Sequence, residues 1–236
     1  ERFLKEDVDG IVLDLRYNGG GILQEAIKLT GLFIEKGPVV QTKDYRGRQR
    51  VMKDSDSGVT YDGPLAVAVS HMSASASEIV AAALQDHGRA IIVGGKATHG
   101  KGTVQQILPL NRSFISRLTE DSGQLKFTIS KFYRINGATT QRDGVTPDII
   151  LPSLLDYIGT SEGDLPRALE SDKIAEAQYD SLDQVSAFFT SLRGASAKRI
   201  SSNQDYKYIL EDIIRAKERK EDPSVSLNED KRRKES

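Results

Sequence analysis

The chain has 236 residues, 38% of them hydrophobic, which suffices for one main core and a smaller appendage. Its 33 basic and 34 acidic residues leave a formal net charge of -1, so no overall charge attracts it to nucleic acid or to an anionic membrane. The absence of cysteine excludes disulfides, thiolate metal sites and a cysteine nucleophile, and the three histidines follow no zinc-binding spacing. No stretch approaches the ~20 apolar residues of a membrane span, and the N-terminus reads as the start of an excised piece rather than as a signal peptide.

The first third of the chain is typical of alternating strands and helices. In chain order the pattern predicts a strand at residues 10–15, a glycine loop at 18–21 and a helix at 22–34. Two polar strands at residues 38–54 and a buried strand at 64–70 follow. The glycine loop, NGGG, indicates a turn or a place where another group approaches the backbone closely. The last of the strands is continuously apolar, as expected at the centre of a sheet.

The alternation continues to residue 152 and then stops. A helix ending near residue 86 is followed by three more strands, at residues 90–95, 102–110 and 125–135, and TPDIILP at residues 146–152 closes this section. This order predicts an α/β layered core with parallel strand pairing. Beyond it the sequence becomes charged and typical of helices, at residues 171–194 and 205–222. Residues 211–236 hold eight basic and eight acidic side chains, as in a solvated helix that frays into disorder.

The segment HMSASASEIVAAALQD, residues 71–86, places three serines in front of an apolar helix. Only Ser75 has a glutamate three residues later, and with Glu78 it fits the capping box that ties down the start of a helix. On this pattern alone, Ser75 stabilises the helix by ~1 kcal/mol and has no further role. The same geometry also suits a nucleophile, because the junction between a buried strand and a helix offers free backbone N–H groups and a positive dipole end.

A nucleophilic serine needs a base that removes its proton, and histidine is the first candidate. The chain offers His71, His87 and His99, with Asp14 or Asp86 to orient them. No histidine lies in a familiar triad context, and the GxSxG motif is absent. We therefore expect each histidine to be an ordinary polar residue.

Lys101 is the second candidate base, because glycines on both sides of it let the backbone turn tightly and approach another group. A lysine acts as a base only if its pKa falls from ~10.4 toward 7, which burial away from water can bring about. Gln105 lies four residues on, an even offset, so in a strand its side chain would face the same side as that of Lys101. The alternative for Gln105 is an exposed polar side chain of a strand.

Residues 95–101, GKATHGK, also match the spacing of a phosphate-binding Walker A loop after a strand. The next position disfavours this interpretation, because Gly102 stands where a serine or threonine would hold magnesium. The residues that follow are typical of a strand, whereas a Walker A loop leads into a helix. The NGGG loop lacks the GxGxxG spacing of dinucleotide-binding folds, and no acidic ribose ligand is evident.

Several of these segments occur in the same order in one known family. GIVLDLRYNGGG, SASASE after an aliphatic strand, AAALQDHGRA, GKGTVQQ and FYRINGATTQRDGVTPDI resemble the carboxyl-terminal processing peptidases, above all their bacterial tail-specific protease branch. The likeness is strong from Val8 to Pro152 and weaker in NQDYKYILEDIIRAKERK, which resembles that branch's helical C-terminal region. It implies a catalytic core of the crotonase and Clp-protease type at residues 1–152 and a helical region at residues 153–236.

The resemblance also implies a site. It implies that Ser75 is the nucleophile, that Lys101 is the general base and that Gln105 orients the lysine. The oxyanion-hole donors would be the backbone amide of Ala76 and that of Gly19, Gly20 or Gly21. Asp86, in the family's QD pair, is either part of the catalytic group or structural. Two features depart from the family pattern: the loop at residues 94–100 is one residue longer than expected, and His99 stands where an aromatic residue is common. Both could alter the placement of Lys101. The PDZ domain and N-terminal region that such proteases carry ahead of this core are missing, as in an excised catalytic fragment.

Together these features predict a serine endopeptidase that works through an acyl-enzyme and needs no metal, nucleotide or other cofactor. The resemblance implies protein substrates with apolar, unstructured C-termini in the periplasm or cell envelope. It implies no nucleic-acid partner, and it leaves room for an adaptor protein and for peripheral membrane association. The competing hypothesis is a non-catalytic scaffold of the same fold, in which Ser75 only caps a helix and Lys101 only pairs with a carboxylate.

Overall fold

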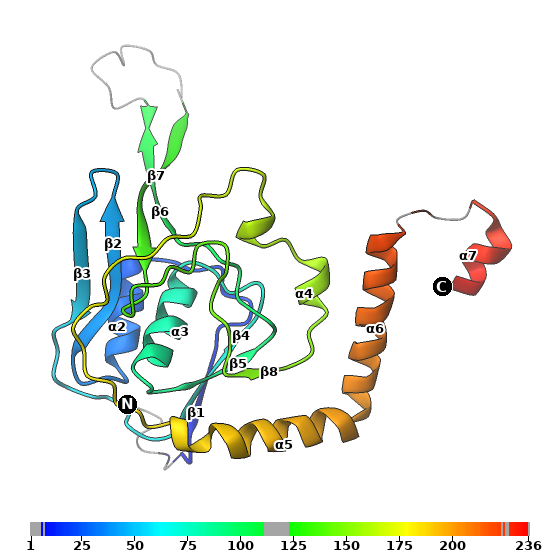
Figure 1. Cartoon of the computed structure of the whole chain (residues 1–236), viewed down its shortest axis with the longest axis horizontal. Helices are drawn as coiled ribbons and strands as arrows, with labels where there is room; N and C mark the ends of the chain where they lie inside the picture. Colours follow the sequence, from blue (N-terminus) through cyan, green and yellow to red (C-terminus); the bar gives the residue numbers. More distant parts are fainter. Residues whose placement is uncertain (1–5, 7, 111–122, 223, 225–226, 236) are drawn as a thin grey trace.

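The computed structural model describes residues 6, 8–110, 123–222, 224 and 227–235. The strands of this part of the chain form two four-stranded sheets (Figure 1). The parallel sheet has the order β1-β4-β5-β8, from strands Ile11–Asp14, Leu65–Val69, Ile91–Gly94 and Ile149–Ile150. The antiparallel sheet has the order β3-β2-β7-β6, from strands Gln49–Asp54, Gly37–Asp44, Gln124–Tyr133 and Thr103–Pro109.

Two helices, α2 (Leu23–Gly31) and α3 (Ala76–Asp86), lie between the sheets. They pack against each other, α2 also contacts β2 and β3, and α3 contacts β2 and β5. Nearly the whole of α3 is buried, from Ala76 to Leu84, because its alanine-rich surface lets elements on every side approach closely. The helix that follows the serine segment is therefore the centre of the core.

The parallel sheet brings three loops to one edge. β4 pairs in parallel register with β1 on one side and with β5 on the other, so the carboxyl ends of all three strands point the same way. The glycine loop follows β1, the serine segment follows β4, and the loop that contains Lys101 follows β5. Such edges are where open α/β sheets bind ligands.

The predicted elements of the core are confirmed, with ends shifted by a few residues. The two polar strands expected at residues 38–54 are β2 and β3, paired antiparallel around a turn with Gly47 at a φ of 77°. The residues after Gly102 form strand β6, so the helix that a Walker A loop requires is not there. The α/β class predicted from the alternation is also confirmed.

The helix predicted at residues 171–194 is wrong over its first half. Residues 171–184 run in extended or irregular form, and the helical part begins with a 3-10 turn at Ser186–Phe188 and continues as α5 (Phe189–Ser202). The backbone of the first half bonds to the core, as in the Ala177 amide to the Ile135 carbonyl at 2.8 Å and the Leu182 amide to the His87 carbonyl at 2.8 Å. These tertiary hydrogen bonds satisfy groups that a helix would have satisfied internally.

The remaining C-terminal elements are helical. They are α4 (Leu155–Ile158), a 3-10 turn at Glu162–Asp164, α6 (Gln204–Glu221) and α7 (Glu229–Glu235). Helix α6 contacts α4 and α5, and Lys217 lies 4.9 Å from the centre of the Tyr157 ring. The disorder expected at the charged end stays a prediction, and residues 223, 225–226 and 236 lie outside the described residues. Among the described helices, none combines the length and the apolar character needed to cross a bilayer.

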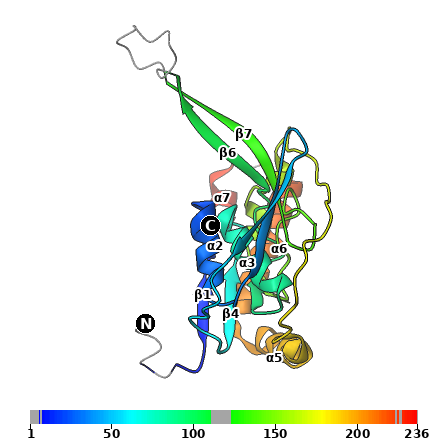
Figure 2. The ribbon, with the colours of Figure 1, turned by 90° about the vertical axis from the view of Figure 1, so that its left-hand side faces the viewer.

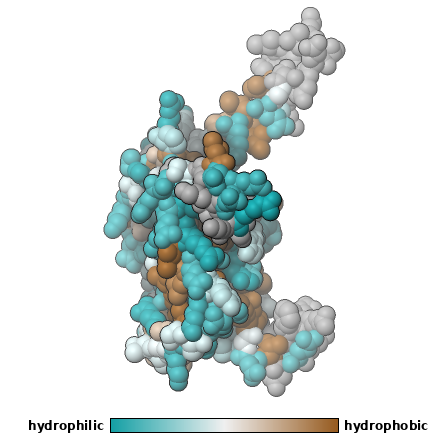
Figure 3. Space-filling model, turned by 90° about the vertical axis from the view of Figure 1, so that its right-hand side faces the viewer, coloured by the Kyte–Doolittle hydropathy of each residue, from teal (hydrophilic) through white to brown (hydrophobic). Residues whose placement is uncertain are grey.

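Strands β6 and β7 continue past the body of the protein as a two-stranded ribbon (Figure 2). The ribbon carries exposed apolar side chains, which appear as brown surface in Figure 3. They are Ile107, Leu108, Leu110, Leu125 and Phe127. β6 is also an edge strand of its sheet, so one side of its backbone is unpaired within the described residues.

Candidate active site

The three serines of the SASAS segment differ in what their hydroxyls do. Ser73 donates to the Leu15 carbonyl at 2.7 Å, and Ser77 donates to the Asn18 carbonyl at 2.9 Å, so both tie the serine segment to the loop after β1. Both are buried. Ser75 is half-buried, and its hydroxyl makes no hydrogen bond within the described part of the chain. Of the three serines, Ser75 is the one whose hydroxyl is left free for chemistry.

The backbone of Ser75 is strained. Its φ of 57° and ψ of -114° lie outside the conformations that residues with a side chain normally adopt. Such backbone strain costs ~1–3 kcal/mol and collects at functional sites. The predicted capping box is present in part: Glu78 accepts from the Ser75 amide at 2.7 Å, while the Ser75 hydroxyl faces the helix as in a capping box but forms no cap hydrogen bond. The cap therefore rests on the Ser75 amide, and the Ser75 hydroxyl at this sharp turn stays without a hydrogen bond.

Gly20 brings the glycine loop against this turn. It has a φ of 108°, and a Cβ placed there would lie 2.8 Å from the Ala74 carbonyl oxygen and 2.8 Å from the Ser75 Cβ. Only glycine fits this backbone conformation and this approach. The Asn18 carbonyl fixes the loop from the other side, since it accepts from the Ala74 amide at 3.2 Å as well as from Ser77.

The backbone amides around Ser75 differ in availability. The Gly20 amide donates to the Asn18 side chain at 2.9 Å, so it is already engaged. The amides of Gly19, Gly21 and Ala76 make no hydrogen bond within the described residues. The Ala76 amide is one of the orphan donors at the start of α3, where the helix dipole is positive. These free amides could hold a developing oxyanion, whereas the Gly20 amide could do so only by leaving Asn18.

The Glu78 carboxylate joins the serine turn to the lysine loop. Its Oε2 accepts from the amides of Ser75 at 2.7 Å and of Lys101 at 3.0 Å, so both amides bond to one oxygen atom. Its Oε1 accepts from the Thr98 hydroxyl at 2.5 Å and from the Gly100 amide at 2.8 Å. Glu78 is fully buried, and this burial raises its pKa to about 7 although the four hydrogen bonds oppose the shift.

Lys101 is half-buried, and its loop is anchored on both sides. Gly100 has a φ of 91°, and a Cβ there would lie 2.6 Å from the Arg142 carbonyl oxygen. The Gly102 amide donates to the Gln141 side chain at 2.9 Å. The Lys101 ammonium makes no hydrogen bond or ion pair with any described residue. The structure thus brings the Lys101 backbone to the serine turn and leaves its amine unpaired.

The Gln105 side chain makes no hydrogen bond to the lysine within the described part of the chain. β6 begins at Thr103, so Lys101 lies outside the strand, and the expectation that the two side chains face the same side by alternation does not apply. Gln105 is exposed, pairs across the ribbon with Thr128, and its side chain makes no hydrogen bond to another described residue. The lysine-orienting role implied by the resemblance stays a prediction.

Asp86 lies at the opposite end of α3 from Ser75. It pairs with Arg134, whose two nitrogens lie 3.1 Å and 2.5 Å from the two carboxylate oxygens, and it accepts from Asn136 at 2.9 Å. The Asp86 side chain is only 6% exposed. This bidentate ion pair lies at the other end of the helix from the serine turn, and whether Asp86 belongs to the catalytic group or is structural stays a prediction.

The histidines and Asp14 are also placed apart from a triad. His87 caps the far end of α3 and lies 2.9 Å from the Pro38 carbonyl oxygen through its Nε2. His71 and His99 lie next to each other, with ring centres 6.2 Å apart, and burial lowers the pKa of His99. Asp14 is bound by Arg16, and this hydrogen bonding lowers the Asp14 pKa to about 2. The expectation that the histidines are ordinary polar residues stays a prediction.

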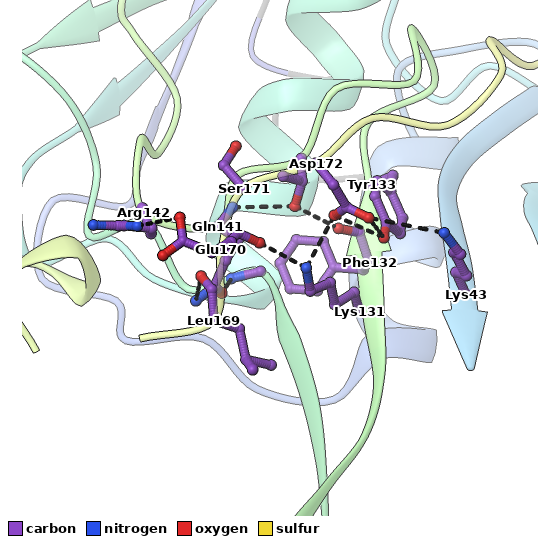
Figure 4. Close-up of polar contacts among 12 residues, drawn as sticks. Lys43, Lys131, Phe132, Tyr133, Gln141, Arg142, Leu169, Glu170, Ser171 and Asp172 are labelled. Carbon is purple, nitrogen blue, oxygen red and sulfur yellow. Dashed lines mark hydrogen bonds and ion pairs between the residues drawn. The ribbon is translucent and has the colours of Figure 1, made fainter. Parts of the chain in front are cut away.

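A segment of the C-terminal region supports the lysine loop from behind. Gln141, which holds Gly102, donates to the Leu169 carbonyl at 3.2 Å and to Glu162 at 3.1 Å. Figure 4 shows the same segment held on β7 by Asp172, which lies 3.0 Å from Lys131. Neither the role of Gln141 nor the contacts of Glu78 with the lysine loop could be predicted from the sequence, since these contacts follow no spacing along the chain. The buried position of Glu78 on the helical pattern is the one signal that could have indicated it.

The comparisons agree with the order of motifs in the sequence. A family model described as Peptidase family S41 matches residues 1–151, and one described as the C-terminal domain of tail specific protease matches residues 155–236. The tail-specific protease of Haemophilus influenzae is 41% identical over 227 residues, which cover 94% of this chain and 32% of that protein. The carboxy-terminal-processing protease of Bartonella bacilliformis is 38% identical over 179 residues, which cover 71% of this chain and 39% of that protein.

A solved structure of a photosystem II D1 C-terminal processing protease is similar in fold. It has a TM-score of 0.55 and 30% sequence identity, and the match covers 64% of this chain and 36% of that chain. The likeness supports the layered α/β architecture of the core. The chain spans about a third of the length of the relatives it matches.

Proposed function

The chain belongs to peptidase family S41, and from this membership we propose that it forms the catalytic part of a serine peptidase of the carboxyl-terminal processing type. The observation that carries the proposal is the state of Ser75. Its hydroxyl is free at a strained turn, while the hydroxyls of Ser73 and Ser77 are bound to carbonyls. A serine that only capped the helix would need neither the strained backbone nor the close approach of Gly20.

In the proposed reaction the Ser75 oxygen attacks the carbonyl carbon of the scissile peptide bond, and neutral Lys101 takes the hydroxyl proton. The carbonyl oxygen becomes an oxyanion held by the Ala76 amide and by the amide of Gly19 or Gly21. Lys101 then passes the proton to the leaving nitrogen as the C–N bond breaks, which leaves an acyl-enzyme on Ser75. Water, deprotonated by Lys101, attacks the ester, and the proton returns to Ser75.

The scaffold hypothesis explains less of the site. In that hypothesis Lys101 pairs with a carboxylate, yet no carboxylate of the described residues forms an ion pair with its amine. The nearest carboxylate contact is that of Glu78, and it receives the Lys101 backbone amide instead. An unpaired amine is what a general base needs, because an ion pair would hold it in the charged form.

For the substrate we propose protein chains with an apolar, extended segment. β6 begins two residues after Lys101 and continues into the ribbon, where Leu108 and Leu125 are cross-strand partners on the same face and Phe127 follows on that face. These side chains are exposed, so an apolar tail could pack on them along the ribbon. An adaptor, peripheral membrane association and a location in the periplasm or cell envelope stay predictions, which cell fractionation would test.

The test of the function is cleavage of an unfolded protein that ends in an apolar tail. We expect Ser75→Ala to abolish cleavage and to leave the melting temperature nearly unchanged, because the Ser75 hydroxyl makes no hydrogen bond. Ser73→Ala is the matched control, since it should lower stability by about 1 kcal/mol per lost hydrogen bond and retain measurable cleavage. Equal cleavage by the parent and Ser75→Ala would overturn the proposed function.

A further inference from the structure

The strongest unexplained feature of the site is the number of donors on Glu78. A capping-box glutamate needs to accept only from the cap residue, here the Ser75 amide. Glu78 accepts three further hydrogen bonds, from Thr98, Gly100 and Lys101. These residues lie on a different loop, 20 or more residues further along the chain. The carboxylate is thus a bridge between two loops as well as a helix cap.

The donor set favours the ionised carboxylate. Both amide groups on Oε2 and the amide on Oε1 can only donate, and the Thr98 hydroxyl already accepts from the Val145 amide at 2.8 Å. A glutamine at this position would turn an NH₂ group toward donors, and a protonated carboxyl would do the same with its O–H. Either change leaves buried donors unpaired and loosens the two loops.

Keeping the Glu78 carboxylate charged in a buried place costs free energy. A bridge with a purely structural role could use an uncharged side chain and avoid this cost. No cation of the described residues pairs with Glu78, so its charge is stabilised by hydrogen bonds alone. Burial accordingly raises its pKa to about 7. No charged group of the described residues is among the causes of the shift in the Glu78 pKa, and the titratable groups of the lysine loop are Lys101 and His99, which lies beside His71 and Glu162.

We propose that Glu78, as a carboxylate, is the positioning residue of the dyad: it holds the backbones of Ser75 and Lys101 at the separation that proton transfer needs. The inference rests on the proposed function and deepens it. Glu78 does not touch the reacting atoms, and it acts by fixing the residues that do. When Glu78 is protonated it loses acceptor capacity, so the tie between the two loops weakens and cleavage slows, although relief of the buried charge makes the folded protein as a whole more stable.

The test compares Glu78→Gln with the parent in cleavage of the same unfolded protein. Misplacement of a catalytic pair by about 1 Å lowers the rate about 100-fold, so we expect kcat to fall by about that factor and KM to change little. The pH profile gives the readout that a merely structural role would not move. In the parent, protonation of Glu78 should lower kcat on the acid side of the profile, and this inflection should be absent from Glu78→Gln.

The matched control is Asp148→Asn, because Asp148 is another carboxylate that accepts hydrogen bonds within the fold. It accepts from the Ile92 backbone amide at 2.8 Å and from the Gln85 side chain at 3.0 Å. This variant should lose stability and keep the kcat and the pH profile of the parent. If Glu78→Gln does not fold, Thr98→Val is compared with Thr98→Ser, since only the serine keeps the hydroxyl that donates to Glu78. Thr98→Val should then lower kcat, and Thr98→Ser should not.

The outcomes separate this inference from the proposed function. If Ser75→Ala is inactive while a folded Glu78→Gln keeps the kcat and pH profile of the parent, Glu78 is not a positioning residue and the dyad stands. Equal kcat for Thr98→Val and Thr98→Ser would overturn the inference in the same way. If Ser75→Ala cleaves as fast as the parent, the function itself is wrong.

Discussion

The two ends of helix α3 differ in how completely their polar groups are satisfied. At the C-terminal end, Asp86 accepts from Arg134 and Asn136, and His87 bonds to a backbone carbonyl. At the N-terminal end, the Ser75 hydroxyl and the Ala76 amide have no partner among the described residues, and the Ser75 backbone is strained. One helix therefore carries a fully bonded structural cluster at one end and free groups at the other.

This difference shows why the type of residue alone does not identify a catalytic group. Aspartate and histidine are common in active sites, yet here Asp86 and His87 already have partners within the fold. Serine is a common helix cap, yet Ser75 is the unbonded member of its segment. Free hydrogen-bonding capacity in a half-buried place is what separates the two ends.

The claim that the N-terminal end of α3 is the catalytic end is tested most strongly by Lys101→Met. This substitution removes the amine and keeps a side chain of similar length. General-base catalysis contributes about 100- to 10,000-fold, so we expect kcat to fall by about 1,000-fold. Stability should change little, because the Lys101 amine makes no hydrogen bond or ion pair with the described residues. Lys53→Met, on the exposed strand β3, is the control and should retain the parent's rate. Parent-like cleavage by Lys101→Met would remove the lysine from the mechanism.

Gly20→Ala tests the N-terminal end of α3 by displacing the backbone of the glycine loop that packs against it. The added Cβ would lie 2.8 Å from the Ala74 carbonyl oxygen and from Ser75, at a φ that favours glycine. The loop must shift, which moves the oxyanion donors, so we expect kcat to fall between about 100- and 1,000-fold. Gly194→Ala, in helix α5 where a Cβ meets nothing within 4 Å, should leave the rate unchanged. A Gly20→Ala enzyme with the parent's kcat would separate this loop from catalysis.

Asp86→Ala tests the bonded end through stability. It leaves the largely buried Arg134 guanidinium without its anionic partner and with Gln85 as its remaining side-chain acceptor, so unfolding by urea should show a loss of about 3 to 5 kcal/mol. Arg134→Ala and the double variant complete a mutant cycle, in which the two losses should be far from additive. Loss of cleavage by Asp86→Ala with unchanged unfolding would instead return Asp86 to the catalytic group.

The pH dependence of stability tests the carboxylate between the two loops. The folded-state pKa of Glu78 is about 7, above its usual value of 4.5, so the folded protein holds this proton more tightly than the unfolded chain. Its contribution to stability is therefore present at low pH and declines by up to about 3 kcal/mol as the pH rises from 4.5 to 7. Urea unfolding of the parent and Glu78→Gln should show this decline only in the parent. Parallel stability curves would contradict the raised pKa.

Much of the core could be predicted from the sequence because its signals are local. The apolar strand at residues 64–70, the serine turn and the alanine-rich helix each follow from periodicity or capping within a few residues. The position of Ser75 at the carboxyl edge of the parallel sheet follows from the same alternation. These predictions are confirmed because local pattern and tertiary fold agree there.

The features that the sequence did not predict depend on contacts between distant segments. Residues 171–184 are rich in helix-forming residues, yet their backbone bonds to the core. Glu78 has the spacing of a cap, but its bonds to the lysine loop form only when β5 pairs with β4. The hydrogen bond from the Gly20 amide to the Asn18 side chain also forms only in the folded loop. It leaves fewer free amides for an oxyanion than the glycine motif contains.

The central claim is that Ser75 is a nucleophile activated by Lys101, and labelling by a fluorophosphonate probe tests it most directly. The probe forms a covalent bond with a serine oxygen only when a base removes the hydroxyl proton, and peptide mapping by mass spectrometry locates the adduct. We predict a single adduct on Ser75 in the parent, none on Ser73 or Ser77, and labelling slowed by about 100-fold or more in Lys101→Met. An unlabelled Ser75, or equal labelling rates in the parent and Lys101→Met, would contradict the account.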